Sequence, residues 1–103
     1  MKIYFTKHAI QRLQERYGYS INDILKLKGT TCPIVRDRKY LFIFLPNGIV
    51  LSCKEEKNKL IVLTILYTFY LSKSIHLKID KGIMDEIEFD PVILKFKNVW
   101  VKS

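Results

Sequence analysis

The feature that most constrains the fold of this chain is a proline-asparagine-glycine turn between two runs of strand-forming residues. Pro46 presets the backbone at the first turn position, and Gly48 allows the positive φ that a tight reversal requires. The flanking runs, Lys39 to Leu45 and Ile49 to Lys54, are rich in Ile, Leu, Val, Phe and Tyr. This pattern predicts a β-hairpin, because such residues favour strands and such turns join antiparallel neighbours.

A further strand is predicted directly after the hairpin. The charged stretch Glu55 to Lys59 interrupts the apolar pattern and predicts a second turn, after which Leu60 to Leu71 follows as a long apolar strand. Both faces of Tyr40 to Leu45 and of Leu60 to Leu66 are apolar. We therefore expect these two strands to lie in the middle of an antiparallel meander that helices cover.

Two helices are predicted ahead of the strands. After a short β-prone start, Lys2 to Phe5, the segment Lys7 to Tyr17 places its apolar residues on one helical face and its polar residues on the other. Ser20 and Asp23 have the spacing of a reciprocal N-terminal cap, and Gly29 supplies a glycine stop. We expect a long amphipathic helix followed by a shorter one.

The order of these patterns predicts an α+β fold in which two N-terminal helices pack on a mainly antiparallel sheet of about four to five strands. A chain of 103 residues forms a single domain, residues 1–103. We expect residues 1–71 to make its core. Residues 72–103 form a C-terminal extension, in which Ser72 to Asp90 lacks firm periodicity and Val92 to Val101 predicts an extra strand.

The net charge of +8 indicates an anionic partner. Twelve lysines and arginines stand against five acidic residues in residues 1–71, whereas the remainder of the chain is nearly neutral. A basic domain attracts nucleic acid, anionic lipid or an acidic protein, and we favour nucleic acid. No apolar run is long enough to span a bilayer and the N-terminus lacks a secretory signal, so we expect a cytoplasmic protein without a membrane partner.

The cysteines and histidines do not indicate a metal site. Cys32 and Cys53 lie far apart in the chain, and neither His8 nor His76 comes at the short paired spacing of a zinc motif. We therefore expect free buried thiols, no metal and no cofactor.

The strongest cluster of chemistry-bearing residues lies on the first predicted helix. His8, Arg12 and Arg16 follow each other at a spacing of four, which stacks them along one edge, with Glu15 beside them. Imidazole transfers protons near neutral pH, and guanidinium groups stabilise charge on a phosphoryl group. Metal-free RNA cleavage by a neighbouring 2′-hydroxyl requires these groups. The same residues also satisfy the polar outer face that any amphipathic helix needs.

The segment Lys7 to Arg16 resembles a known motif. It matches the H-A-x-x-R-x-x-E-R pattern of a family of small bacterial and phage domains grouped with the RelE-like toxin ribonucleases. The resemblance covers roughly residues 2–68 and includes the order of helices and strands, so it implies a RelE-like fold. It also implies the signature polar residues, which are His8, Arg12, Arg16 and, as the ion-pair partner that orients an arginine, Glu15.

The resemblance extends to the strand after the second turn. Leu60 to Tyr67 is similar to the family's last strand, which implies a catalytic role for Thr64 and a binding role for Tyr67. These two residues are three apart, so one pocket holds both only if a bulge intervenes. The family mostly ends soon after this strand, so the longer tail here adds a strand, covers the site or binds a partner.

Further candidate binding residues are basic or aromatic. Arg36 and Arg38 share a face by the period of two, and in an RNA-binding protein they contact the backbone or the scissile phosphate, with Lys7 adding charge at the helix start. The alternative for the two arginines is charge on a solvated edge strand. Most strand aromatics are predicted core residues, and Trp100 is the one retained as a contact with bases.

Two functional hypotheses remain open. In the first, the protein binds RNA, free or on the ribosome, and is a metal-independent toxin-type ribonuclease, with His8 as general acid or base and Arg12 and Arg16 on the phosphate. The resemblance then implies a cognate antitoxin protein. In the second, it is a non-catalytic phage or mobile-element protein that binds and inhibits a host factor. Exposed strand edges favour a homodimer in either case.

Overall fold

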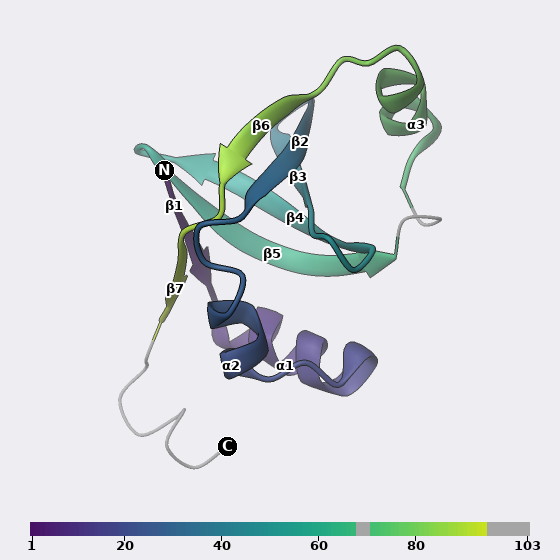
Figure 1. Ribbon diagram of the computed structural model, residues 1–103. Helices are drawn as coiled ribbons and strands as arrows, with labels where there is room; N and C mark the ends of the chain where they lie inside the picture. The colour runs from purple at the N-terminus through teal and green to yellow at the C-terminus, as the bar shows by residue number, and fades with distance from the viewer. Residues whose placement is uncertain (68–70, 95–103) are drawn as a thin grey trace.

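The computed structural model describes residues 1–67 and 71–94, which form seven strands and three helices (Figure 1). No described helix is long and apolar enough to cross a membrane. In chain order the elements are β1 (Lys2–Phe5), α1 (Lys7–Tyr17), α2 (Ile21–Leu25), β2 (Thr31–Asp37), β3 (Tyr40–Phe44), β4 (Ile49–Glu56), β5 (Lys59–Tyr67), α3 (Lys73–Asp80), β6 (Asp85–Glu88) and β7 (Pro91–Ile93).

The described strands belong to one mixed sheet in the order β6-β2-β3-β4-β5-β1-β7. Neighbours pair antiparallel from β6 to β5, whereas β1 is parallel to both β5 and β7. The two edge strands, β6 and β7, follow each other in the chain with Phe89 and Asp90 between them. So short a connection requires the sheet to curl until its edges approach, and Figure 1 shows it as a half-barrel.

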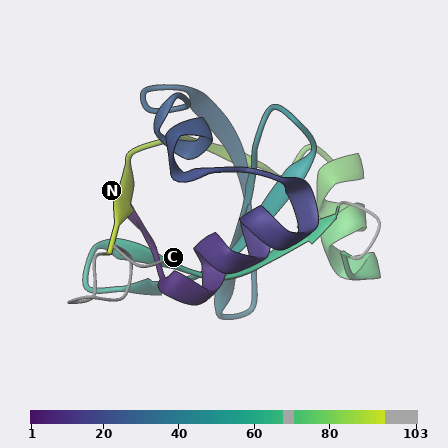
Figure 2. The same ribbon diagram turned by 90° about the horizontal axis from the view of Figure 1, so that it is seen from below.

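The concave face of the sheet encloses the larger core. Phe5 and Phe89 are fully buried there and meet edge to face, with 6.1 Å between their ring centroids. α1 contributes Ile10 and Leu13 to this core, and α2 contributes Ile24. The two helices lie across one end of the half-barrel (Figure 2). They therefore exclude water from the concave face, which is the main source of stability at this end.

A smaller core lies on the convex face. Val35, Phe42 and Val50 project outward from neighbouring strands and pack against Leu71 and Ile75, from α3 and the segment before it. Because strand side chains alternate between faces, the central strands serve both cores. Figure 1 shows α3 apart from α1 and α2, so the sheet separates the third helix from the N-terminal pair.

Local sequence signals place the early elements as predicted. α1 spans Lys7–Tyr17, with Thr6 as its N-cap and Gly18 ending it at φ 65°. Ser20 and Asp23 form the reciprocal capping box at the start of α2. β3 and β4 form the predicted hairpin. Each of these predictions is confirmed, because each depends on interactions between residues that are close in the chain.

The predicted fold class is wrong for the sheet as a whole. Instead of two N-terminal helices on a mainly antiparallel, RelE-like sheet of about four to five strands, the described chain has three helices and a seven-stranded, mixed and curled sheet. Two differences produce this result. β1 inserts between β5 and β7 through parallel pairing, and the segment after residue 71 adds α3, β6 and β7.

The sequence pattern does not predict α3 and β6, because each of these elements buries few side chains. Ile75 is the buried residue of α3, and β6 places the half-buried Ile87 among exposed acidic residues. Of the strand predicted from Leu60 to Leu71, β5 includes the residues up to Tyr67, and of the strand predicted from Val92 to Val101, β7 includes only Val92 and Ile93. Residues 68–70 and 95–103, with Trp100, lie outside the described residues.

Candidate functional site

β1 pairs with β5 only as far as Phe5, and beyond that point α1 lies beside β5 in its place (Figure 2). Near the start of the helix, Thr6 Oγ1 donates to the Val62 carbonyl at 3.5 Å. At its end, Arg16 Nη1 donates to the Ile65 carbonyl at 3.4 Å. β1 pairs with β5 as far as Val62, so these bonds fall at and beyond the end of β1. They hold the helix along the edge of β5.

His8 and Arg12 make the contact that their spacing predicts. Arg12 Nε donates to His8 Nε2 at 3.3 Å. Because Nε2 accepts this bond with its lone pair, the imidazole in this arrangement is neutral and carries its proton on Nδ1. His8 is exposed and Arg12 is half-buried. A proton acceptor and a permanent positive charge thus lie side by side at the surface.

Arg16 belongs to the same edge and also anchors the end of α1. Tyr67 Oη donates to the Arg16 carbonyl at 3.5 Å, and the Tyr67 ring packs against Tyr17 with 4.7 Å between centroids. A guanidinium has five N–H donors, and the bond to Ile65 uses one of Arg16's. Arg16 therefore keeps donors for an anion, while Tyr67 contacts the helix backbone and supports its last turn.

The two other predicted residues of α1 lie outside these contacts. Glu15 is exposed, and none of the ion pairs among the described residues includes it. Lys7 is half-buried as the first residue of the helix. The groups that orient the arginines are instead the His8 ring for Arg12 and the β5 backbone for Arg16.

Thr64 lies on the convex face of the sheet. β5 has a bulge at Leu63, because Thr64 pairs with Ser52 while the preceding paired residue of β5 is Val62. The next residues alternate regularly: Ile65 belongs to the concave core and Leu66 packs on the convex core. The bulge precedes Thr64, so it does not bring Thr64 and Tyr67 to one face. No described hydrogen bond joins Thr64 to the residues of α1.

Arg36 and Arg38 lie at the far end of β2. Arg36 forms an exposed ion pair with Glu55 at 3.4 Å, and Arg38 takes φ 58° in the turn to β3. Across the sheet, Arg36 pairs with Leu41 on β3, Leu41 with Cys53 on β4, and Cys53 with Val62 on β5. Arg36 is therefore three strand spacings, or about 14 Å, from Val62. The two arginines line one hollow together. They are separate from the edge of α1.

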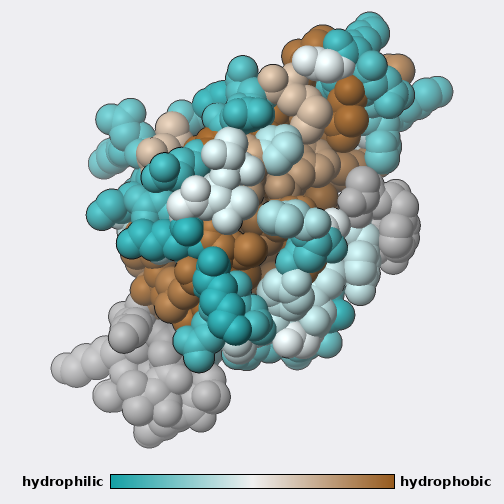
Figure 3. Space-filling view, in the orientation of Figure 1, coloured by the Kyte–Doolittle hydropathy of each residue, from teal (hydrophilic) through white to brown (hydrophobic). Residues whose placement is uncertain are grey.

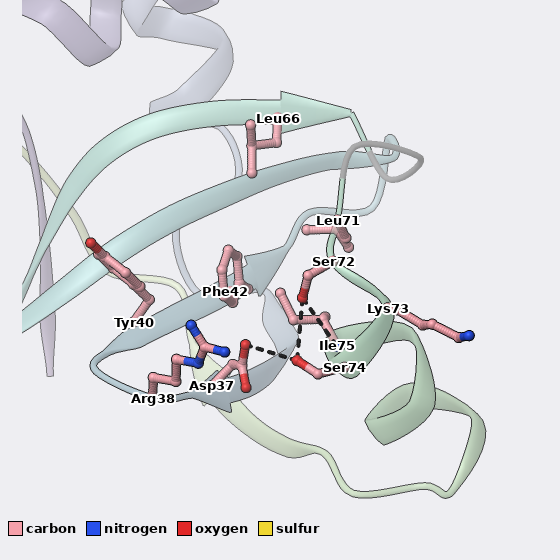
Figure 4. A pocket seen from close by; sticks show the side chains of 10 residues that line it. All are labelled: Asp37, Arg38, Tyr40, Phe42, Leu66, Leu71, Ser72, Lys73, Ser74 and Ile75. Atoms are coloured by element: carbon pink, nitrogen blue, oxygen red, sulfur yellow. Dashed lines mark hydrogen bonds between the residues drawn. The ribbon is translucent and has the colours of Figure 1, made fainter.

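A cavity of about 450 Å³ lies on the convex face between the sheet and α3 (Figure 4). Arg38 and Phe42 line it from the sheet, and the start of α3 closes the opposite side. Ser74 Oγ donates to Asp37 Oδ2 at 3.0 Å, whereas the Lys73 side chain extends outward. None of its described lining residues comes from α1. The sequence does not predict this cavity, because α3 forms half of it and the sequence pattern does not predict α3.

Two tyrosines on the convex face carry lysines over their rings. Lys59 Nζ lies 5.1 Å from the ring centroid of Tyr4, and Lys39 Nζ lies 5.8 Å from that of Tyr40. Tyr40 is 38% exposed, so the expectation that strand aromatics are core residues does not hold for it. The face seen in Figure 1 shows apolar surface mainly over β7 and beside α3, between hydrophilic side chains (Figure 3).

The cysteines are free and buried, as predicted. Burial raises the pKa of both thiols, Cys32 and Cys53, so neither is an activated nucleophile. Within residues 1–67 and 71–94, His, Cys, Asp and Glu side chains form no group of three that could hold a metal ion.

Comparison with known proteins adds no relative on which a function could rest. No family model, no curated protein and no solved structure matches the chain.

Proposed function

We propose that this protein binds RNA along the His8–Arg12–Arg16 edge of α1 and cleaves it without a metal ion. The observation that carries the proposal is the 3.3 Å contact between Arg12 Nε and His8 Nε2, which pairs a proton acceptor with a phosphate-binding group. The net charge of +8 supports an anionic substrate. The motif resemblance of residues 7–16 supports the assignment of roles.

The reaction begins with a change of partner for Arg12. A phosphate oxygen accepts a charge-assisted bond, which is stronger than the bond to a neutral imidazole. Arg12 therefore moves onto the substrate phosphate and frees the Nε2 lone pair of His8. His8 Nε2 then takes the proton of the ribose 2′-hydroxyl.

The chemical step exchanges one ester bond for another. The 2′-oxygen forms a bond to phosphorus as the bond from phosphorus to the 5′-oxygen breaks, and the leaving 5′-oxygen takes a proton from water. The products are a 2′,3′-cyclic phosphate and a 5′-hydroxyl. Arg12, and Arg16 through its remaining donors, stabilise the negative charge that grows on the phosphoryl oxygens. Arg16 keeps its position because the Ile65 carbonyl holds it.

We assign the protein to the cytoplasm, where its substrate is found. The resemblance adds two partners to the proposal: the ribosome as the place where the RNA is presented, and an antitoxin protein that neutralises the enzyme. An antitoxin would act most directly by covering the exposed edge of α1.

The proposal is tested with a labelled single-stranded RNA in buffer that contains EDTA. We expect the wild type to produce 2′,3′-cyclic phosphate ends. His8→Ala should lower the cleavage rate by roughly 10²–10⁴-fold, the usual contribution of a general acid or base. Arg12→Ala should also lower it strongly, and Arg12→Lys should recover little because an ammonium lacks the bidentate fork.

Gln14→Ala is the matched control, because Gln14 is an exposed polar residue of the same helix outside the proposed edge. It should cleave at the wild-type rate. Cleavage that survives His8→Ala in purified, folded protein contradicts the assigned site. If the folded wild type leaves both free RNA and ribosome-bound messenger RNA intact, the ribonuclease proposal is rejected in favour of a binding protein.

A further inference from the structure

The convex face carries a row of side chains that extends across four neighbouring strands. Tyr40 on β3 pairs with Lys54 on β4, Lys54 with Ile61 on β5, and Ile61 with Tyr4 on β1. Leu63, the bulged residue of β5, adjoins this row and lines a hollow with Tyr40 and Lys54. With Lys59, whose amine lies over the Tyr4 ring, these residues form what we call the outer strip: Tyr4, Tyr40, Lys54, Lys59, Ile61 and Leu63.

Half of the outer strip is exposed to solvent, and Tyr4, Lys59 and Ile61 are half-buried. Tyr40 and Leu63 are each 38% exposed, and the side chain of Lys54 is 55% exposed. α3 packs on Phe42 and Val50 in a neighbouring part of the convex face, and Tyr40 lines the cavity between the sheet and that helix. The other strip residues do not line that cavity, and no strip residue belongs to either core cluster.

The charge around the strip is positive. Lys54 and Lys59 belong to it, and the exposed Lys2 and Lys39 lie at its margins, opposite Lys59 and over Tyr40 respectively. The neighbouring carboxylates already have cationic partners. Glu56 is 3.5 Å from Lys54, Glu55, which lines the hollow of the strip, is 3.4 Å from Arg36, and Asp37, at the end of the row, accepts from Lys78 at 3.4 Å. Because Lys54 is paired with Glu56, the excess positive charge comes from Lys2, Lys39 and Lys59.

We propose that the outer strip binds single-stranded RNA, with bases stacked on Tyr4 and Tyr40 and the backbone held by the surrounding lysines. Aromatic rings on an open sheet face, bordered by basic side chains, have the chemistry that recognises unpaired bases. The two tyrosines lie three strand spacings apart, about 14 Å, so they hold different bases of one strand. Each lysine now over a ring then moves to a phosphate.

This inference rests on the proposed function in taking RNA as the ligand, and it adds that the RNA is unpaired. β5 connects the two surfaces: its outer face carries Ile61 and Leu63, and its edge binds α1 at Val62 and Ile65. An RNA strand on the outer strip is therefore bound by β5, the β-strand that also positions α1. A duplex would hide the bases that the strip contacts.

The test measures, by anisotropy at several salt concentrations, binding of a fluorescein-labelled single-stranded 12-mer RNA whose 2′-O-methyl riboses prevent cleavage. We expect Tyr40→Leu and Tyr4→Leu each to weaken binding roughly ten-fold, because leucine keeps the apolar contacts and removes the stacking face. Tyr40→Phe keeps the ring and should bind like the wild type. Lys54→Gln should weaken binding and lower its salt dependence, whereas Lys26→Gln, an exposed lysine after α2, is the control.

Thermal unfolding of each variant separates loss of binding from loss of fold, and Tyr40→Phe provides a folded comparison in any case. The inference is overturned if the leucine variants bind single-stranded RNA as tightly as the wild type, or if a duplex of the same sequence binds equally well. It is also overturned if the variants change the oligomeric state while RNA binding is unchanged, because the strip is then an interface between copies.

The cleavage assay distinguishes this inference from the ribonuclease proposal. His8→Ala should fail to cleave the unmodified 12-mer, and adding Tyr40→Leu to this variant should weaken its binding by the same factor of roughly ten as in the wild type. If the wild type binds through the strip and cleaves nothing, the strip is supported and the ribonuclease proposal fails. If the wild type cleaves RNA while Tyr4→Leu and Tyr40→Leu bind and cleave normally, the ribonuclease stands and the strip is rejected.

Discussion

At the scale of single residues, burial controls the chemistry of Cys53. Its side chain is fully buried in the concave core, and its Sγ donates to the Leu51 carbonyl at 3.7 Å. Burial disfavours the thiolate, which raises the pKa of Cys53 far above that of a free thiol. In the unfolded chain the Cys53 thiol ionises near pH 8.5, whereas in the folded protein it keeps its proton at that pH.

This difference predicts how stability depends on pH. A group whose pKa is raised by folding stabilises the protein below its unfolded pKa, and that contribution falls as pH rises above it. Between pH 8.5 and 10 we expect Cys53 to reduce the free energy of unfolding by about 2 kcal/mol. Urea unfolding of the wild type and Cys53→Ala at pH 7, 8.5 and 10 should show the gap between them narrowing with pH. A gap that stays constant contradicts the prediction, and so does rapid labelling of the native thiol by a maleimide at pH 8.

At the scale of elements, the start of α2 depends on two side chains that cap each other. Asp23 accepts from the Ser20 backbone N–H at 2.8 Å, and Ser20 Oγ accepts from the Asp23 N–H at 3.2 Å. The bond from the Ser20 backbone, followed by that from its hydroxyl, lowers the pKa of Asp23. The capping box therefore stabilises the protein above the ordinary aspartate pKa, and its contribution is lost as pH falls through the lowered value.

We expect Ser20→Ala to lower the free energy of unfolding by about 1 kcal/mol at pH 7. Asp23→Asn should destabilise the protein at pH 7 and make less difference at pH 3, because the stabilisation by the carboxylate declines once the pH falls below the ordinary aspartate pKa. Urea midpoints at the two pH values measure both effects. Equal effects of Asp23→Asn at pH 7 and pH 3 would show that the charge of the cap has no role.

At the scale of the whole molecule, stability depends on the short connection between the two edges of the sheet. Phe89 lies in this connection, has no exposed surface and packs against Phe5 in the concave core. Its backbone N–H donates to the Thr30 carbonyl and its carbonyl accepts from the Gly29 N–H, both at 2.8 Å, which continues the pairing of β6 with β2. The C-terminal part of the chain is therefore integral to the concave core.

We expect Phe89→Ala to destabilise the protein by about 3–5 kcal/mol, the usual cost of removing a buried phenylalanine. A chain ending at residue 71 should fail to unfold cooperatively, because it lacks α3 and both edge strands. Chemical denaturation followed by circular dichroism measures both effects. A truncated chain with a cooperative transition would show instead that residues 1–71 fold alone.

The elements that depend on interactions between residues close in the chain could be predicted from the amino-acid sequence. Thr6 and Gly18 bound α1, the Pro46-Asn47-Gly48 turn joins β3 to β4, and the spacing of His8 and Arg12 brings their side chains into contact, because each depends on residues a few positions apart. Periodicity also predicted the apolar face of α1, since one helix repeats its own pattern.

How those elements combine into one sheet could not be predicted from the sequence and is seen in the tertiary structure. The parallel pairing of β1 and the curl that brings β6 near β7 join segments far apart in the chain, and no local pattern encodes such pairings. The same holds for the outer strip, because Tyr4 and Tyr40 belong to one row only once four strands have paired. Whether an aromatic residue is buried or exposed depends on which helix covers its face, and that is a property of the assembled sheet.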